Sequence, residues 1–434
     1  MSSENENEKM DQVAAYRHLN SLVYAAPSSG SLISQRTQKL SYPASLTYTL
    51  GSTIQFVVNS GSEAVWGPSS YIKLKLEHTN GASAPTICGS MFNLFNQARL
   101  YHRSGELLEQ IMFSDVRTNV MLRYATSFND YQKLKYLIGA TDVPGDTSAP
   151  LGMTSLTAGA KTSYFNLPLS LLFGVFGNHN QYIPSQLLAG ARVELVLNST
   201  VANCGLTNVT SISGISPVLS LDCATLFDDA QKQILEESAD VAESGIQFNY
   251  STWFSSQFTP TGGALNIDVL QSASITEKVF LVGSSGAAAS AGADKFNFKS
   301  LSTGAEYSLQ SRQGSHYMPI YAIQNDNESF YYTQLAFNAG YHQYSSEPAS
   351  SGISVQYFTP TSTQNNCVYA FSLEKSAAGV ALSGDPTNNS LIVNVSCQNA
   401  SNVGVVDNGF NVATVFLQYI RTANCMVDSC VVDR

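Results

Sequence analysis

Apolar and polar residues alternate along much of this chain, and the alternation is most regular between residues 165 and 197. The apolar positions of this stretch are Phe165, Leu167, Leu169 and Leu171, followed by Ala191, Val193, Leu195 and Leu197. A period of two predicts β-strands whose apolar face lies in a core. Arg192 and Glu194 occupy the other face of the second strand, so we expect that face to meet solvent or a neighbour. The stretch therefore predicts two strands of an antiparallel sandwich.

Similar patterns predict strands in both halves of the chain. In the first half they lie at 46–50, 54–58, 71–78 and 219–227, and a hairpin at 99–111 turns at Ser104-Gly105. Within 71–78, the apolar face consists of Ile72, Leu74 and Leu76, and the polar face of Lys73, Lys75 and Glu77. In the second half, strands are predicted at 246–258, 264–270, 277–282, 296–318 (a pair), 367–373, 391–395 and 412–420.

Helical spacing interrupts the strands at corresponding places in the two halves. The pattern predicts a helical segment over 113–137, with Ser114 or Asp115 as its N-cap, a short helix over 328–339 and a helical turn over 90–97. Residues 140–162 and 284–293 are rich in Gly, Ser, Ala, Thr or Pro, which predicts loops. The acidic, helix-prone residues 228–243 lie at the midpoint, where we expect a domain boundary.

Composition adds a further constraint. The 434 residues include only 12% charged side chains, against about 25% in typical soluble domains. Because interface cores are depleted of charge, such a polar but charge-poor surface suits packing against copies of the same chain. A β-rich secreted protein would share this bias, so composition leaves that alternative open.

Charge and cysteine usage exclude several classes. A net charge of −10 argues against a protein whose main surface binds nucleic acid. The 7 cysteines are scattered and odd in number, which favours buried thiols in a reducing compartment over a disulfide framework. The polar N-terminus predicts no secretory signal peptide, and no apolar run is long enough to predict a membrane span.

Candidate chemistry is sparse. The chain has no G-x-S-x-G motif and no phosphate-binding loop, and its six histidines are never at metal-ligand spacing. Cys425 and Cys430 lack the second pair of ligands that a zinc site needs. The adjacent Glu236 and Glu237 would point apart on a helix, so they do not form an acid/base pair. We therefore predict no catalytic, cofactor-binding or metal-binding residues and no enzymatic activity. Glycosidase carboxylates on a sandwich would carry no sequence signature, so that alternative stays open.

Several stretches resemble the double jelly-roll major capsid proteins of tailless icosahedral DNA viruses, of the polinton-like virus and virophage type. The first has the pattern N-L-P-L-x-x-L-F-G, then Y-I-P, then L-x-x-G-x-R-x-E-L, within residues 165–197. The others are the hairpin LYHRSGELLEQI at 100–111 and the segment at 371–395. With order preserved, the resemblance covers about residues 40 to 425.

The resemblance implies an all-β fold of two consecutive eight-stranded jelly-roll β-sandwiches with short helical insertions. The expected divisions are an N-terminal arm (1–40), a first jelly roll (41–227), a helical linker (228–244) and a second jelly roll (245–434). An arm that tucks under neighbouring subunits and plain disorder are both compatible with residues 1–40.

The resemblance also implies a function. It predicts a structural protein that forms homotrimers, and trimers that pack as pseudo-hexagonal capsomers into an icosahedral shell around a double-stranded DNA genome. Its partners would be neighbouring capsomers together with penton and minor capsid proteins, and its location would be the virion. No specific nucleic-acid site is expected. The alternative is a β-sandwich carbohydrate-binding module, a lectin or adhesin, with tyrosines at the loop end.

Overall fold

The computed structural model describes 15 segments of the chain, which together carry both halves of the fold. These segments are 33–142, 147–153, 158–179, 182–226, 246–259, 264–269, 275–284, 295–296, 298–301, 307–313, 316–337, 367–373, 391–397, 412–425 and 430–433. The predicted linker helix (228–243), residues 1–32 of the predicted arm and nearly all of the predicted loop 284–293 lie outside the described residues.

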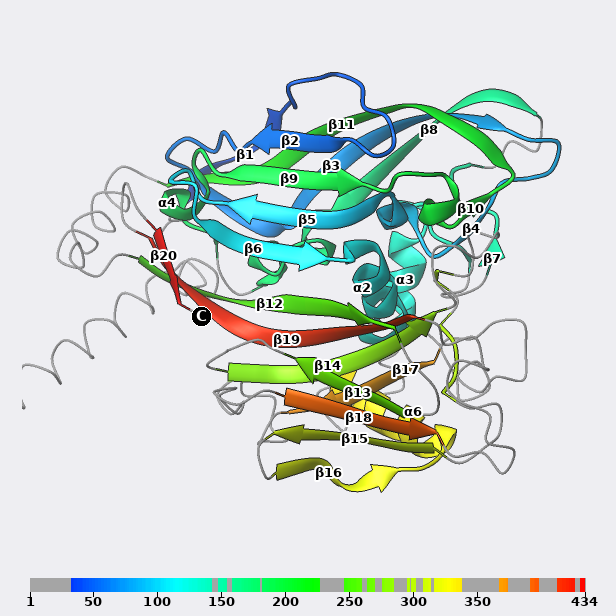
Figure 1. Cartoon of the computed structure of the whole chain (residues 1–434). Helices are drawn as coiled ribbons and strands as arrows, with labels where there is room; N and C mark the ends of the chain where they lie inside the picture. Colours follow the sequence, from blue (N-terminus) through cyan, green and yellow to red (C-terminus); the bar gives the residue numbers. More distant parts are fainter. Residues whose placement is uncertain are drawn as a thin grey trace, which may run out of the picture.

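The first half of the chain forms a sandwich of two four-stranded sheets, coloured blue to green in Figure 1. One sheet has the order β1-β11-β3-β8 and the other the order β2-β9-β5-β6. The first contains β1 (Ile33–Ser41), β3 (Ala64–Asn80), β8 (Gly159–Pro168) and β11 (Val209–Leu226). The second contains β2 (Thr53–Val57), β5 (Phe95–Tyr101), β6 (Leu107–Met112) and β9 (Arg192–Leu197). A small sheet joins β4 (Thr86–Cys88), β7 (Thr147–Ser148) and β10 (Leu206–Thr207).

The second half forms another sandwich. Its sheets have the orders β12-β19-β14-β17 and β13-β18-β15-β16. The first contains β12 (Ile246–Phe258), β14 (Ile275–Ser284), β17 (Val368–Ser372) and β19 (Val412–Cys425), with β20 (Cys430–Asp433) also paired to β19. The second contains β13 (Ala264–Val269), β15 (Tyr307–Gln313), β16 (His316–Ile323) and β18 (Leu391–Cys397).

The two sandwiches share one topology. When the eight sandwich strands of each half are numbered in chain order, both halves have the sheet orders 1-8-3-6 and 2-7-4-5, with β20 outside this scheme. Two facing sheets of eight strands with this order form a jelly roll. The predicted all-β fold of two consecutive jelly rolls is therefore confirmed.

Short helices lie at the predicted places. The α-helices are α2 (Ser114–Val120), α3 (Phe128–Leu134), α4 (Ser185–Leu188) and α6 (Asp326–Phe337), and a π-helical turn, η2 (Met121–Ala125), follows α2. The 3-10 helices are η1 (Met91–Leu94), η3 (Leu169–Leu171), η4 (Val175–Gly177) and η5 (Ala202–Cys204). The predicted helical segments at 90–97, 113–137 and 328–339 are thus confirmed within a few residues.

The N-cap prediction for α2 is wrong. The cap position is Phe113, which has a left-handed backbone (φ 52°), and no side chain caps the helix there. Ser114 instead donates its hydroxyl hydrogen to the Phe95 carbonyl, while Asp115 accepts a hydrogen bond from its neighbour Val116. Both residues therefore lie within the first turn of the helix, and neither occupies the N-cap position before it.

Strand registers follow the alternation closely. Ile72, Leu74 and Leu76 in β3 are fully buried. In β9, Val193 and Leu195 are likewise fully buried, whereas the intervening Arg192 and Glu194 lie on the opposite face. The predicted hairpin is formed by β5 and β6, and Gly105 in its turn has φ 90°, a conformation that glycine adopts without strain.

The strand predictions at 46–50 and 165–171 need correction at residue level. Residues 46–50 form no strand, because only Tyr48 makes a β-bridge, to Ile215, and Leu46 is exposed where the chain crosses from one sheet to the other. The strand predicted at 165–171 begins at Gly159, inside the predicted loop 140–162, and ends at Pro168. Proline has no N–H for a ladder hydrogen bond, so the chain turns into η3 there.

Part of the range assigned to the expected arm is a strand. Residues 33–40 of that range lie in β1, which pairs antiparallel with β11 over its whole length. This strand is polar, so apolar periodicity does not reveal it, and it is held by backbone hydrogen bonds at a sheet edge. In the second half, β17 is buried on both faces, from Val368 to Phe371, because α6 packs on the side away from the sandwich core.

Candidate functional site at the junction of the two jelly rolls

The two sandwiches meet where β6 of the first lies beside β12 of the second (Figure 1). The Leu108 carbonyl in β6 accepts hydrogen bonds from the Tyr250 hydroxyl in β12 and from Nη1 of Arg421 in β19, the latter at 2.8 Å. At the other end of β6, Ser255 donates to the Met112 carbonyl at 2.9 Å. Side chains of the second jelly roll thus bind the backbone of the first.

A buried carboxylate lies at the centre of this junction. Glu109, in β6, accepts hydrogen bonds from the backbone N–H of Gly174 at 2.8 Å and of Val175 at 3.2 Å. The Thr252 hydroxyl of β12 donates to the same carboxylate at 2.9 Å. Burial raises the pKa of Glu109, while these donors and the charge of Arg117 act in the opposite direction. The carboxylate therefore connects three segments of two domains.

Arg117 of α2 lies over the same region. Its Nη1 donates to the Leu171 carbonyl at 2.6 Å, and its guanidinium carbon lies 5.4 Å from the ring centre of Trp253 in β12. Burial lowers the pKa of Arg117 to about 10, a shift that Glu109 opposes, so the side chain stays charged at neutral pH. The indole of the second jelly roll thus packs against a cation of the first.

An ion pair between Lys295 and the buried Asp115 closes the junction at the N-terminus of α2. Asp115 is fully buried and accepts hydrogen bonds from Lys295 Nζ and, at 2.9 Å, from Asn198 Nδ2. Asn198 immediately follows β9, and its Nδ2 also donates to the Asn93 carbonyl at 2.7 Å. An acidic side chain in the first turn of a helix also interacts favourably with the helix dipole.

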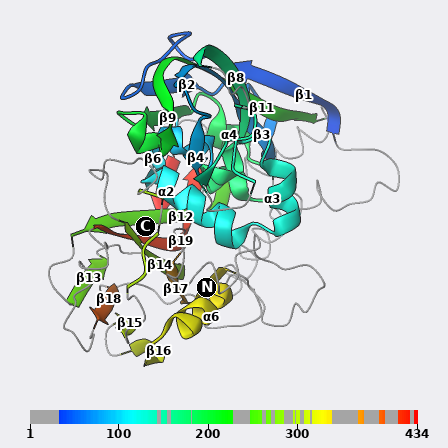
Figure 2. The same cartoon turned by 90° about the vertical axis from the view of Figure 1, so that its right-hand side faces the viewer.

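Helix α2 and η2 place apolar side chains in the second core as well as in the first. Figure 2 shows α2 between the first sandwich above it and β12 below it. Val116, Val120 and Tyr124 belong to the hydrophobic cluster of the second jelly roll, and the Tyr124 ring stacks on Phe337 of α6 at 5.6 Å. Arg123 donates to the Phe296 carbonyl at 2.9 Å. The insertion thus belongs to the first half by sequence and packs against both halves.

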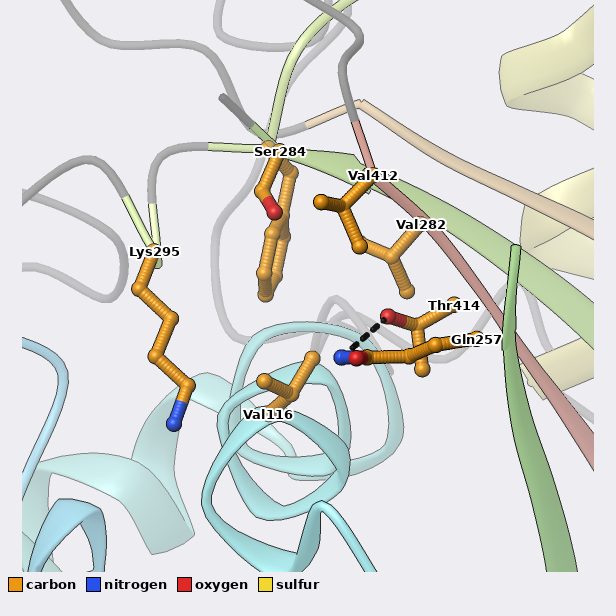
Figure 3. A pocket seen from close by; sticks show the side chains of 8 residues that line it. Val116, Gln257, Val282, Ser284, Lys295, Val412 and Thr414 are labelled. Carbon is orange, nitrogen blue, oxygen red and sulfur yellow. Dashed lines mark hydrogen bonds between the residues drawn. The ribbon is translucent and has the colours of Figure 1, made fainter. Parts of the chain in front are cut away.

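A small cavity of about 70 Å³ lies beside α2 (Figure 3). Its lining comes from α2, from strands β12, β14 and β19, and from residues 295 and 298: Val116, Gln257, Val282, Ser284, Lys295, Phe298, Val412 and Thr414. Gln257 donates to the Thr414 hydroxyl at 3.2 Å across one side. Ligand pockets usually measure about 300–1,000 Å³, so this space is small for a ligand site.

The described residues contain no group of three or more His, Cys, Asp or Glu side chains that could hold a metal ion. Cys88, Cys204, Cys223 and Cys367 are buried thiols, as predicted, and burial raises the pKa of Cys204 to about 12. Glu236, Glu237 and the side chains of Cys425 and Cys430 lie outside the described part. No helix in that part is long and apolar enough to cross a membrane.

The junction residues Glu109, Asp115, Arg117 and Lys295 were not predicted from the sequence. The only sequence signal is that a charged residue follows apolar ones, as Glu109 follows Leu107 and Leu108 in β6. This signal does not indicate which residue the charge contacts. Their partners are up to 180 residues away in the chain. Local patterns do not reveal such pairs.

Two jelly rolls of one topology, joined through a buried junction, define a double jelly-roll protein. A comparison with family models finds no match, and neither does a search of curated proteins. Solved structures do match over nearly the whole chain, and they include viral capsid proteins.

Three of these structures illustrate the likeness. A chain of the PBCV-1 virus capsid matches with a TM-score of 0.64 at 9% identity, covering 95% of this chain and 99% of that chain. The Sputnik virophage structure gives 0.59 at 12% identity, covering 94% and 90%. The mavirus major capsid protein gives 0.56 at 11%, covering 95% and 92%. The resemblance predicted from the sequence is confirmed as the double jelly-roll fold of such capsid proteins.

Proposed function

We propose that this chain is a structural major capsid protein that forms homotrimers, and that the trimers pack as capsomers into an icosahedral shell around a double-stranded DNA genome. The observation that supports this most is the double jelly-roll fold, shared with viral capsid proteins over 95% of the chain. Its expected partners are neighbouring capsomers with penton and minor capsid proteins, and its place is the virion.

The junction supports a mechanical role. Buried polar groups whose hydrogen bonds are satisfied hold neighbouring segments in one arrangement. Glu109 and Asp115 each bind groups from both halves of the chain. We infer that the two jelly rolls, 41–227 together with β1 and 245–434, move as one rigid tile, and that the chain has no enzymatic role.

The oligomeric state of the purified protein tests this proposal. Mass photometry should give a mass three times that of the 46.7 kDa chain, and negative-stain images should show capsomers or shells under assembly conditions. A protein that stays monomeric at micromolar concentration and binds a glycan resin would contradict the capsid role. That result would favour the lectin alternative.

A further inference from the structure

An amine, a carboxamide and a carboxylate meet in the buried junction of the two jelly rolls. They belong to Lys295 of the second half, to Asn198 just after β9, and to Asp115 of α2. Asp115 is fully buried, Asn198 is 5% exposed, and the Lys295 side chain is 13% exposed. In Figure 3, that lysine side chain runs beside the small cavity toward α2. The three groups are therefore in mutual contact and largely shielded from water.

Hydrogen bonds fix the orientation of the Asn198 carboxamide. Its Nδ2 donates to Asp115 Oδ2 at 2.9 Å and to the Asn93 carbonyl at 2.7 Å. A carbonyl and an ionised carboxylate can only accept, so the amide nitrogen must point toward them. Its Oδ1 therefore faces Lys295 Nζ, at 3.4 Å. The backbone is held too, because the Asn198 N–H donates to the Leu94 carbonyl at 2.8 Å.

The Lys295 amine thus lies close to an electrophilic carbon. A C=O bond is about 1.2 Å long, so Nζ at 3.4 Å from Oδ1 is within about 4.6 Å of Asn198 Cγ. A nucleophile reacts from about 3–3.5 Å, so a displacement of about 1 Å brings Nζ to attacking distance. Because both partners are held in place, the encounter needs no further ordering of the chain.

Asp115 is placed to move the protons that this reaction requires. Its Oδ2 accepts hydrogen bonds from both Lys295 Nζ and Asn198 Nδ2, while its Oδ1 accepts from the Val116 N–H at 2.8 Å. A proton that passes from Nζ to Oδ2 frees the lone pair of the amine, and an uncharged pair costs less to bury than two charges. The same oxygen can then give the proton to Nδ2, the leaving group.

We propose that Lys295 and Asn198 react to form an amide cross-link between the two jelly rolls, with Asp115 transferring the protons. Nζ attacks Cγ, so the Nζ–Cγ bond forms and the Cγ–Nδ2 bond breaks. Two of the three protons of the lysine ammonium group pass through Asp115 to Nδ2, one before the attack and one after it. Nδ2 leaves as ammonium, and Asp115 ends as a carboxylate. The reaction consumes no co-reactant, and each chain carries it out once.

The cross-link joins residues that are 97 positions apart in the sequence. It ties the end of β9 in the first jelly roll to the second jelly roll at Lys295. A covalent loop of this kind stabilises a fold mainly by restricting the unfolded chain. This inference goes beyond the capsid role, because one chain holds all three residues and the link forms whether or not copies assemble.

Mass spectrometry of the denatured, unaltered protein tests the proposal. The chain should be lighter than its sequence mass by one ammonia. Trypsin cleaves after unmodified Lys and Arg, so its digest should contain one branched peptide that joins residues 193–232 to residues 279–299. A succinimide at Asn198 also loses ammonia but leaves the two peptides separate, so the branched peptide is the decisive species.

Three variants complete the design. Lys295→Arg keeps a cation beside Asp115 but has no amine that can attack, and Asp115→Asn keeps the size of the side chain but cannot transfer the protons. Both should give their full sequence mass and no branched peptide, with circular dichroism confirming the β-sheet signal. Lys133→Arg is the matched control, because its pair with Asp130 is exposed, and it should keep the branched peptide.

An unaltered protein with its full sequence mass and separate peptides overturns the cross-link. A branched peptide that persists in Asp115→Asn overturns the role of Asp115. If Asp115→Asn yields no folded protein, Lys295→Arg still decides, since it retains the ion pair. A loss of ammonia that persists in Lys295→Arg overturns the assignment of Lys295 as the attacking amine.

Discussion

Charged side chains are seldom fully buried in proteins, yet four of them lie at the junction of the two jelly rolls. They are Glu109, Asp115, Arg117 and Arg123. Each has hydrogen-bond partners, several of them backbone groups, and this offsets the cost of removing a charge from water. A partner lost from such a site leaves an uncompensated charge, so these residues should tolerate change poorly.

The pH dependence of stability should report Glu109. Its pKa in the folded protein is raised above the usual 4.5 by burial, so the protonated carboxyl favours folding. That contribution is complete below the unfolded-state pKa and is lost as pH rises through the folded-state pKa. Urea denaturation over this range should show that the unaltered protein loses stability relative to Glu109→Gln as pH rises. Thr252→Val, which removes a donor to the ionised form, should extend the loss to higher pH. Parallel profiles for the unaltered protein and Glu109→Gln would contradict this.

Gly174 tests how closely the two domains approach. A Cβ atom at this position would lie 1.6 Å from the Ser251 carbonyl oxygen of β12, so Gly174→Ala must displace backbone at the junction. We expect a loss of about 1–3 kcal/mol in the free energy of unfolding, as for other overpacked sites. Gly177→Ala is the matched control, because its Cβ would meet only the Ser170 carbonyl oxygen at 3.7 Å. If Gly174→Ala and Gly177→Ala lowered the free energy of unfolding equally, the two domains would be packed less closely at Gly174 than the structure indicates.

At the scale of elements, α2 is the segment whose placement decides how the halves are joined. It starts directly after β6 through the left-handed Phe113, a conformation that is uncommon for a non-glycine residue. This sharp turn directs the helix out of the first sandwich and toward the second. The pair Asp115 and Lys295 then holds its first turn in place.

Removing Lys295 should therefore weaken the whole junction. Lys295→Met leaves the buried Asp115 carboxylate with only Asn198 and backbone donors, and breaking a buried pair in this way costs about 3–5 kcal/mol. Lys133→Met is the matched control, because its pair with Asp130 is exposed and should contribute about 0–1 kcal/mol. Chemical denaturation of the three proteins measures both effects. A Lys295→Met variant as stable as Lys133→Met would contradict a structural role for the pair.

The register of β9 gives a sharper test of the first core. Val193 is fully buried, so Val193→Asp places a carboxylate in the core at a cost of several kcal/mol, against a total stability of about 5–15 kcal/mol. It should yield no soluble folded protein. Glu194→Ala should fold, since this residue contacts Arg192 at 3.1 Å on the outer face. Soluble expression and circular dichroism decide, and a tolerated Val193→Asp would mean that the strand faces the other way.

At the scale of the whole molecule, the two halves share their cores. Phe248 and Tyr250 of β12 pack in the cluster of the first jelly roll, whereas Val116 and Val120 of α2 pack in that of the second. Neither half can therefore expose its junction surface without uncovering apolar side chains that belong to the other. This exchange favours unfolding of the chain as one unit.

The two tryptophans allow a direct measurement, because Trp66 lies in β3 of the first half and Trp253 in β12 of the second. Trp66→Phe and Trp253→Phe each leave one fluorescent reporter. In urea, the fluorescence midpoint of each variant should coincide with its own far-UV circular dichroism midpoint, as two-state unfolding requires. The halves would unfold independently if the fluorescence midpoint lay below the circular dichroism midpoint in one variant and above it in the other.

Much of the architecture could be predicted from the sequence. Alternation placed the inward residues of β2, β3 and β9 correctly, because a pleated strand sends successive side chains to opposite faces. The repeated order of strands, helix and loop in the two halves indicated two similar sandwiches. The residues at 165–197 carried the resemblance that the comparison of structures confirms at the level of fold. The sequence did not predict strand β1, because it is polar, or the end of β8 at Pro168.

The sequence by itself thus determined the strand class, the inward faces and the division into two halves, since these depend on contacts between neighbours along the chain. Only the tertiary structure decided which edges meet and which charges are buried. Glu109 binds Thr252 across 143 residues, and Asp115 binds Lys295 across 180. Such pairs leave no local pattern, because their geometry exists only after two sandwiches have folded and docked. The physical reason is that periodicity indicates which face of a strand is buried, but not what buries it. At the junction, each half of the chain covers a surface of the other half.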